Sequence, residues 1–145
     1  MKQQTYGLLL LALLGSAPVA AQDATAGQTV FKKCQACHDI GDNAKNRMGP
    51  VLSGVVGRVA GTYPGFKYST AMVDAGTGGL TWSPETLDAF LAAPRDYVAG
   101  TKMTNISVKD ATDRANVIAY LQTLSGPSTS LPGLTAPGTP PAATP

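Results

Sequence analysis

Apolar residues recur at helical spacing in four stretches of the chain. Each stretch begins at a residue whose side chain can accept a hydrogen bond from the first turn of a helix. The expected starts are Asp23 or Thr25, Ser69, Ser83-Pro84 and Asp110. The apolar faces are Ala26, Val30, Phe31 and Cys34; Ala71 and Met72; Leu87, Phe90 and Leu91; and Val117, Ile118, Leu121 and Leu124. We expect the second helix to end near Gly76, the third at Pro94 and the last at Gly126-Pro127.

The segment from Gly41 to Gly65 differs from these stretches, because it is rich in Gly, Asn and Pro and has no sustained periodicity. A loop this long is unusual inside a small packed domain. It is typical of a chain that wraps around a ligand and uses that ligand as part of its core.

The two ends of the chain are predicted to lie outside the folded domain. Lys2, the apolar run from Leu8 to Leu14 and the small residues before position 22 together predict an export signal over residues 1–21, cut after Ala21. The alternative is an uncleaved anchor, but the apolar run is shorter than the roughly 20 residues of a spanning helix. Residues 126–145 are rich in Pro, Thr, Ala and Gly and carry no charge, which predicts a flexible tail. One domain over residues 22–125 remains.

The charges of the chain nearly cancel. There are 11 basic and 9 acidic residues, so loss of Lys2 with the signal leaves ten against nine. This balance does not indicate nucleic-acid binding. We expect an exported, soluble, periplasmic monomer with no membrane insertion.

Cys34-Gln35-Ala36-Cys37-His38 contains both cysteines and the only histidine of the chain. A C-x-x-C-H run predicts covalent attachment of a c-type haem through both thiols, with the imidazole bound to the iron. A structural zinc site needs four ligands, and three are present. A redox dithiol is expected beside a βαβ pattern, which is missing, and a disulfide across two residues would be strained. The fold class is therefore all-α, with three to four helices and loops wrapped around one haem.

The second axial ligand would decide what the haem does. No other histidine exists, so the candidates in the mature chain are Met48, Met72 and Met103. Met48 is only ten residues past His38, and Met72 lies on a helical stripe, whereas Met103 sits in a polar loop between two helices. We therefore favour Met103. Ligation by His and Met raises the reduction potential and leaves no open site, which favours electron transfer over catalysis.

The ordered motifs of residues 27–124 resemble the class I c-type cytochromes, a family that includes mitochondrial cytochrome c and bacterial cytochrome c2. The matching pieces are Gly27-Gln28-Thr29-Val30-Phe31, Gly49-Pro50-Val51-Leu52, Gly57-Arg58, Pro64-Gly65-Phe66-Lys67-Tyr68, Leu80-Thr81-Trp82, the run from Pro94 to Met103, Arg114, and Ile118-Ala119-Tyr120-Leu121. The resemblance implies the small cytochrome c fold. It also implies that the carbonyl of Pro50 orients the imidazole of His38.

Further roles follow from the same resemblance. Gly27, Phe31 and Tyr120 would lie where the first and last helices cross. Arg58, Tyr68 and Trp82 would bind the inner haem propionate, although the two aromatic residues could equally be core packing. Phe90 and Asn105 depart from the family, which commonly has tyrosine and phenylalanine there. Basic residues would surround the exposed haem edge as a docking ring: Lys32, Lys33, Lys45, Arg47, Arg95, Lys102 and Lys109.

The function implied is that of a one-electron carrier and not an enzyme. Its expected donor is a cytochrome bc-type complex, and its expected acceptor is a photosynthetic reaction centre or a terminal oxidase. The alternative is a haem enzyme, or a protein that binds gas or peroxide, with a displaceable sixth ligand.

Overall fold

The structure is a computed structural model and describes residues 22–125. Its helices are α1 (Ala24–Phe31), α2 (Thr70–Thr77), α3 (Pro84–Ala92), α4 (Pro94–Tyr97) and α5 (Ala111–Thr123). Strand-like pairing within this part of the chain is limited to one antiparallel bridge between Val59 and Thr81. The all-α prediction is confirmed, and the four expected helices are all present. The signal over residues 1–21 and the tail after 125 lie outside the described residues.

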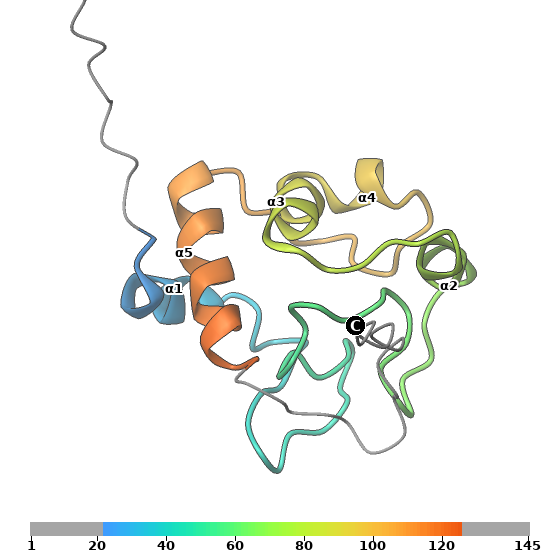
Figure 1. The fold of residues 1–145 in the computed structure, drawn as a ribbon, viewed down its shortest axis with the longest axis horizontal. Helices are drawn as coiled ribbons and strands as arrows, with labels where there is room; N and C mark the ends of the chain where they lie inside the picture. The colour runs from blue at the N-terminus through green and yellow to red at the C-terminus, as the bar shows by residue number, and fades with distance from the viewer. Residues whose placement is uncertain (1–21, 126–145) are drawn as a thin grey trace, which may run out of the picture.

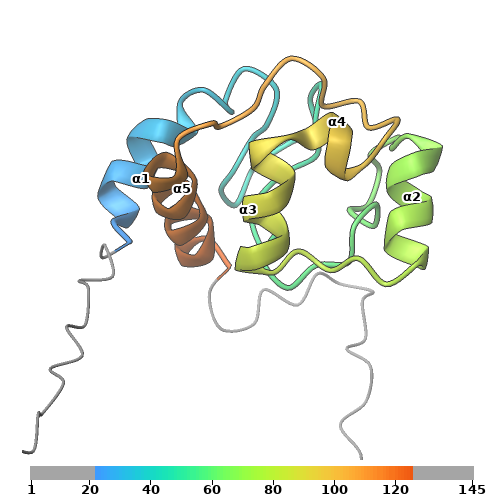
Figure 2. The ribbon, with the colours of Figure 1, turned by 90° about the horizontal axis from the view of Figure 1, so that it is seen from above.

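Helix α1 crosses α5 at one side of the molecule, and the long loop region and α3 extend from this pair (Figures 1 and 2). Gly27 makes the crossing possible, because a Cβ atom there would overlap the main-chain carbonyl of Asn116. Phe31 is fully buried and packs against Tyr120 with the ring centres 5.5 Å apart. The side chain of Asn116 accepts a hydrogen bond from the amide of Asp23 at 2.9 Å, which ties the start of α1 to α5. The predicted contact of the two helices is confirmed.

Helix starts follow the capping residues expected from the sequence. Asp23, not Thr25, caps α1, and Ser69 and Asp110 cap α2 and α5. Ser83 and Thr86 form a reciprocal capping box at α3, beside the proline at its first position.

The prediction that the third helix stops at Pro94 is confirmed, but the short helix that begins at this proline was not predicted. Helix α3 ends at Ala92, and Pro94 is the first residue of the one-turn helix α4. Proline suits either place, because it lacks the amide hydrogen that the first turn of a helix leaves unpaired. The extended backbone of Ala93, the residue between them, separates the two helices. Likewise, α1 ends at Phe31, so Cys34 lies in the turn after the helix and not on it.

The region from 41 to 69 contains no helix and covers one side of the molecule as successive turns (Figure 1). Side-chain hydrogen bonds hold these turns together. Asn46 donates to the carbonyl of Pro64 at 3.0 Å and accepts from the amide of Val51 at 3.2 Å. The loop predicted from Gly41 to Gly65 is confirmed, and it contributes the buried residues Val51, Val55 and Ala60 to the core.

Candidate haem-binding site

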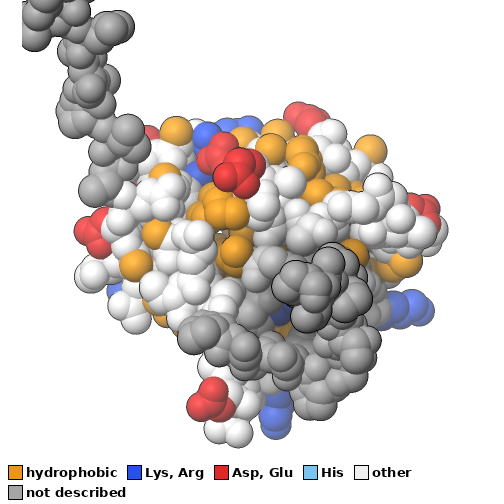
Figure 3. Space-filling view, in the orientation of Figure 1, with side chains coloured by type: hydrophobic (Ala, Val, Ile, Leu, Met, Phe, Trp, Pro, Cys, Tyr) orange, Lys and Arg blue, Asp and Glu red, His pale blue; other side chains and the backbone are white. Residues whose placement is uncertain are grey.

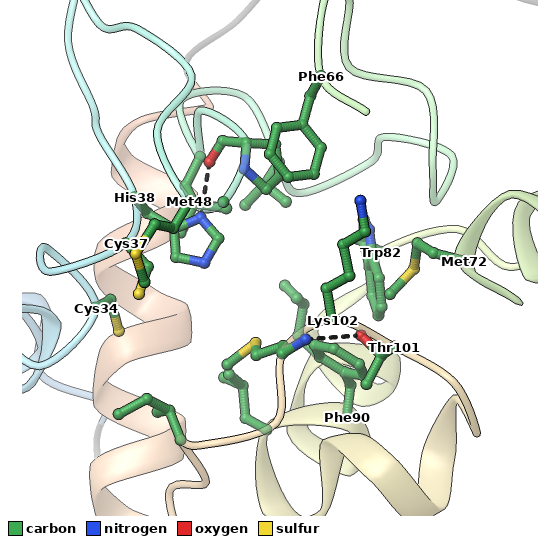
Figure 4. A pocket seen from close by; sticks show the side chains of 18 of the residues that line it. Cys34, Cys37, His38, Met48, Phe66, Met72, Trp82, Phe90, Thr101 and Lys102 are labelled. Atoms are coloured by element: carbon green, nitrogen blue, oxygen red, sulfur yellow. Dashed lines mark hydrogen bonds between the residues drawn. The ribbon is translucent and has the colours of Figure 1, made fainter. Parts of the chain in front are cut away.

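An apolar cavity opens between the turns of residues 34–69, helices α3 and α5 and the loop after α4 (Figure 4). Its wall is built mainly from aliphatic, aromatic and thioether side chains. Every residue expected to bind the haem or its iron lines this cavity: Cys34, Cys37, His38, Arg58, Tyr68, Trp82 and Met103. Residues that are up to 69 positions apart in the sequence thus converge on one space.

The two cysteines and the histidine are presented by a tight turn that follows α1. The amide of Gln35 donates to the carbonyl of Phe31 at 3.2 Å, and the amide of His38 donates to the carbonyl of Cys34 at 2.9 Å. All three side chains reach the same side of the cavity (Figure 4). Cys34 and Cys37 are not joined to each other by a disulfide. Burial raises the pKa of the Cys34 thiol, while neighbouring Lys33 opposes the rise.

The imidazole of His38 is fixed from two directions. Its Nδ1 lies 2.7 Å from the carbonyl oxygen of Pro50, so Nδ1–H donates and Nε2 keeps a free lone pair. Gly49 lies against the ring, where a Cβ atom would collide with it. Burial lowers the pKa of His38, although the hydrogen bond to Pro50 opposes the change. The neutral imidazole favoured by burial is the form that binds a metal.

All three methionines of the domain line the cavity, but their settings differ. Met72 is 7% exposed and belongs to the hydrophobic core. Met48 is 75% exposed and lies beside Cys37 and His38 (Figure 4). Met103 is half-buried and follows Thr101 and Lys102, which lie across the cavity from His38 (Figure 4). The hydroxyl of Thr101, itself 7% exposed, accepts a hydrogen bond from the amide of Met103 at 3.3 Å.

Arg58 brings a positive charge to the cavity wall while being only 7% exposed. Its guanidinium donates to the carbonyl of Val51 at 2.9 Å and to that of Ser53, and it lies over the ring of Tyr63, 4.6 Å from the centroid. Its Nε has no hydrogen-bond partner within the described chain. Burial lowers the pKa of Arg58 and raises that of Tyr68, which lines the cavity nearby.

These residues fit a covalently attached haem. Two thiols and a neutral imidazole on one side of an apolar space suit the porphyrin and its iron. An incompletely satisfied guanidinium in the wall suits an anionic group, because a buried donor is costly to leave unpaired. A zinc site is not supported, since the described residues contain no group of three or more His, Cys, Asp or Glu placed to hold a metal.

Comparisons with known proteins agree with this geometry. The family model described as cytochrome c matches residues 24–125. Cytochrome c2 of Blastochloris viridis is 43% identical over 122 residues, which cover 84% of this chain and 93% of that protein. The chain belongs to the cytochrome c family. Among solved structures, cytochrome c2 of Rhodospirillum centenum has a TM-score of 0.67 at 40% identity and covers 71% of this chain and 98% of that one. Cytochrome cH of Methylobacterium extorquens has a TM-score of 0.63 at 41% identity, covering 70% and 98%.

Membership of the cytochrome c family settles the cofactor and the class of function. The protein carries covalently bound haem c, and it is an electron carrier and not an enzyme. Cys34 and Cys37 fit the C-x-x-C-H motif of that attachment. The competing interpretation as a haem enzyme is therefore not retained. Among the described residues, no helix is both long and apolar enough to cross a membrane.

The basic residues predicted to form a docking ring do not all lie around the haem cavity. Lys102 lines the haem cavity, whereas Arg95 and Lys109 border a separate shallow hollow beside α4. Several of these basic groups also have internal partners. Lys33 pairs with Asp113 at 3.4 Å and Arg47 lies 3.9 Å from Asp39, while Lys102 and Lys109 donate to main-chain carbonyls.

Sequence reasoning named Lys102 as a docking residue but did not predict several contacts that shape the site. Gly49 supports the imidazole, Thr101 orders the turn before Met103, and Lys102 donates across the cavity mouth to the carbonyl of Lys67 at 2.6 Å. The positions of all three residues within matched family motifs gave the only signal. The contact of Lys102 joins loops 35 positions apart, which no local pattern reveals, whereas the contact of Thr101 lies within its own turn.

Proposed function

We propose that this cytochrome transfers single electrons with His38 and Met103 as the axial ligands of its haem iron. The observation that carries the proposal is the arrangement across the cavity: a fixed imidazole on one side, and on the other a loop that presents a half-buried thioether. Haem supplies an iron that changes valence by one electron. A thioether is a soft donor that favours the ferrous state, so this ligand pair suits a carrier of relatively high potential.

The remaining residues of the site would keep the protein from rearranging when the iron gains or loses an electron. The carbonyl of Pro50 holds the imidazole in one orientation, and Gly49 leaves room for it. The apolar wall, which includes Trp82, Phe90 and Leu121, would exclude water from the iron. Arg58, Tyr68 and Trp82 would hold the inner propionate, with Arg58 supplying the charge.

The donor is proposed to be a cytochrome bc-type complex, and the acceptor a photosynthetic reaction centre or a terminal oxidase. Transfer between membrane complexes on the outer side of the cytoplasmic membrane would require export, in agreement with the signal predicted over residues 1–21. Docking would use the basic residues around the cavity through transient contacts. Comparison of reduction by purified bc-type complex with re-oxidation by reaction centres and by oxidase membranes distinguishes these partners.

Replacement of the proposed ligand tests the ligation directly. In the ferric Met103→Ala protein we expect loss of the far-red band of methionine–iron ligation, rapid binding of cyanide and a lower reduction potential, because the soft sixth ligand is gone. Met72→Leu is the matched control, since Met72 also lines the cavity and leucine preserves its packing. Unaltered spectra and voltammetry of Met103→Ala would exclude Met103 as the ligand.

A further inference from the structure

Tyr63 contacts two residues proposed to hold the inner propionate, Arg58 and Tyr68, but it does not itself line the haem cavity. We propose that Tyr63 is a positioning residue, whose ring holds the guanidinium of Arg58 in the cavity wall, keeps water from it and so raises the reduction potential of the haem. The inference rests on the proposed function, because it requires Arg58 to face the propionate. None of the motifs that predict the site includes Tyr63.

The ring of Tyr63 covers a charge that is otherwise held only at its edge. The guanidinium carbon of Arg58 lies 4.6 Å from the ring centroid. Two of its nitrogens donate to the carbonyls of Val51 and Ser53, and its Nε has no partner within the described chain. Because guanidinium N–H groups point outward in one plane, these bonds leave the faces of the group free. A cation against an aromatic face is attracted to it, and more strongly where water is excluded.

The turn that follows Tyr63 is anchored to the same loop that holds Arg58. The side chain of Asn46 donates to the carbonyl of Pro64 at 3.0 Å and accepts from the amide of Val51 at 3.2 Å. The carbonyl of Val51 in turn accepts from Arg58 at 2.9 Å. These bonds and the ring contact form a closed network, so the positions of the ring and the cation depend on each other.

Tyr63 also contacts Tyr68, through its main chain. The amide of Tyr63 donates to the hydroxyl oxygen of Tyr68 at 3.3 Å. A hydroxyl has one proton and two lone pairs, so an oxygen that accepts this bond keeps its proton for donation to an anion. Because the donor is a main-chain amide, substitution of the Tyr63 side chain removes only the ring contact with Arg58.

The charge of Arg58 connects this contact to the reduction potential. A nearby cation disfavours the ferric state, because ferric iron carries one more positive charge than ferrous iron. The same cation offsets the negative charge of the propionate, which would otherwise favour the ferric state. Both effects weaken when water surrounds the guanidinium, since water screens charge. Arg58 is only 7% exposed, and removal of the ring beside it should admit water and lower the potential.

The test measures the reduction potential of the haem-loaded protein by redox titration at fixed pH and ionic strength. In Tyr63→Leu we expect the equilibrium constant for reduction by a reference couple to fall about two- to fivefold, which is roughly 20–40 mV at 59 mV per tenfold for one electron. Tyr63→Phe keeps the ring and should match the wild type. Tyr97→Leu is the matched control and should also match it, because Tyr97 is partly exposed and stacks on no cation within the described residues.

A double-mutant cycle separates an effect through Arg58 from a general disturbance. In an Arg58→Gln background, Tyr63→Leu should leave the potential unchanged, because the charge on which the ring acts is gone. Arg58→Lys is the second background, for use if Arg58→Gln does not fold. Lysine keeps the charge but not the planar group that stacks on a ring, so the effect of Tyr63→Leu should be smaller there than in the wild type.

Several outcomes would overturn the inference and leave the carrier function intact. They are equal potentials in the wild type and Tyr63→Leu, an equal loss in Tyr63→Phe or Tyr97→Leu, and an undiminished effect of Tyr63→Leu in the Arg58 backgrounds. Loss of the far-red band in Tyr63→Leu would overturn it too, because the fall would then arise at the iron ligand. A folded Arg58→Gln protein with the potential of the wild type would instead refute the proposed role of Arg58. Failure of the proposed ligation would appear separately, in Met103→Ala.

Discussion

At the scale of single residues, the site depends on small groups that leave space for larger ones. Gly49 is the clearest case, because the ring of His38 occupies the volume where a side chain would begin. The carbonyl of the next residue, Pro50, holds Nδ1 of the same ring at 2.7 Å. Two consecutive residues therefore fix both the position and the tautomer of the imidazole.

Replacement of Gly49 by alanine should push the imidazole away from Pro50. Over-packing of this kind costs about 1–3 kcal/mol, so we expect the free energy of unfolding of the haem-loaded protein to fall by that order, as measured by denaturant titration. Gly78→Ala serves as the control, because a Cβ atom there meets no atom closer than 3.3 Å. If Gly49→Ala and Gly78→Ala were equally stable, the proposed support of His38 would be wrong.

At the scale of elements, two loops face each other across the cavity mouth. One, after α4, carries Met103, and the other carries Tyr68. The ammonium group of Lys102 joins them by donating to the carbonyl of Lys67 at 2.6 Å, across 35 positions of sequence. Lys102 was predicted as a docking residue, and this contact gives it a second role, to hold the Met103 loop closed.

Removal of this contact should let the Met103 loop open more often. We expect the ferric Lys102→Gln protein to bind cyanide at least several-fold faster than the wild type, because a hydrogen bond to a charged group contributes about 1.5–3 kcal/mol. Lys45→Gln removes the same charge from a side chain that makes no hydrogen bond or ion pair within the described residues, and it should leave the rate unchanged. Equal cyanide-binding rates in both variants would show that Lys102 does not restrain the loop.

At the scale of the whole molecule, several basic side chains are paired with carboxylates or hydrogen-bonded to main-chain carbonyls. They do not form one continuous basic face. Arg114 is committed to Asp88 at 2.7 Å, joining α5 to α3, and Lys33 is paired with Asp113. Figure 3 shows acidic and basic side chains interspersed on the face in view. Long-range steering should therefore be weaker than a count of the seven predicted docking residues suggests.

The dependence of the electron-transfer rate on ionic strength measures how much electrostatic steering contributes to docking. We expect the second-order rate of reduction by a bc-type complex to fall as salt is raised, because screening removes steering between exposed charges. Lys45→Glu should reduce the rate at low salt more than Lys33→Glu, since Lys33 already has a carboxylate partner. A rate that does not respond to salt would remove the electrostatic part of the docking proposal.

The sequence by itself determined the cofactor, the covalent attachment and the helical class. Cys34, Cys37 and His38 act through spacing within one turn, and helix caps and apolar stripes are equally local, so both are visible in the order of residues. Even there, Pro94 was ambiguous, because proline both ends and begins helices.

Only the tertiary structure decided which residues share the cavity and what each of them touches. It separates the exposed Met48 and the core residue Met72 from Met103, although all three line the same space. It also shows Lys33 and Lys102 engaged with groups 80 and 35 positions away. Contacts of this range form when distant segments fold around a common core, and no local pattern of residues encodes them.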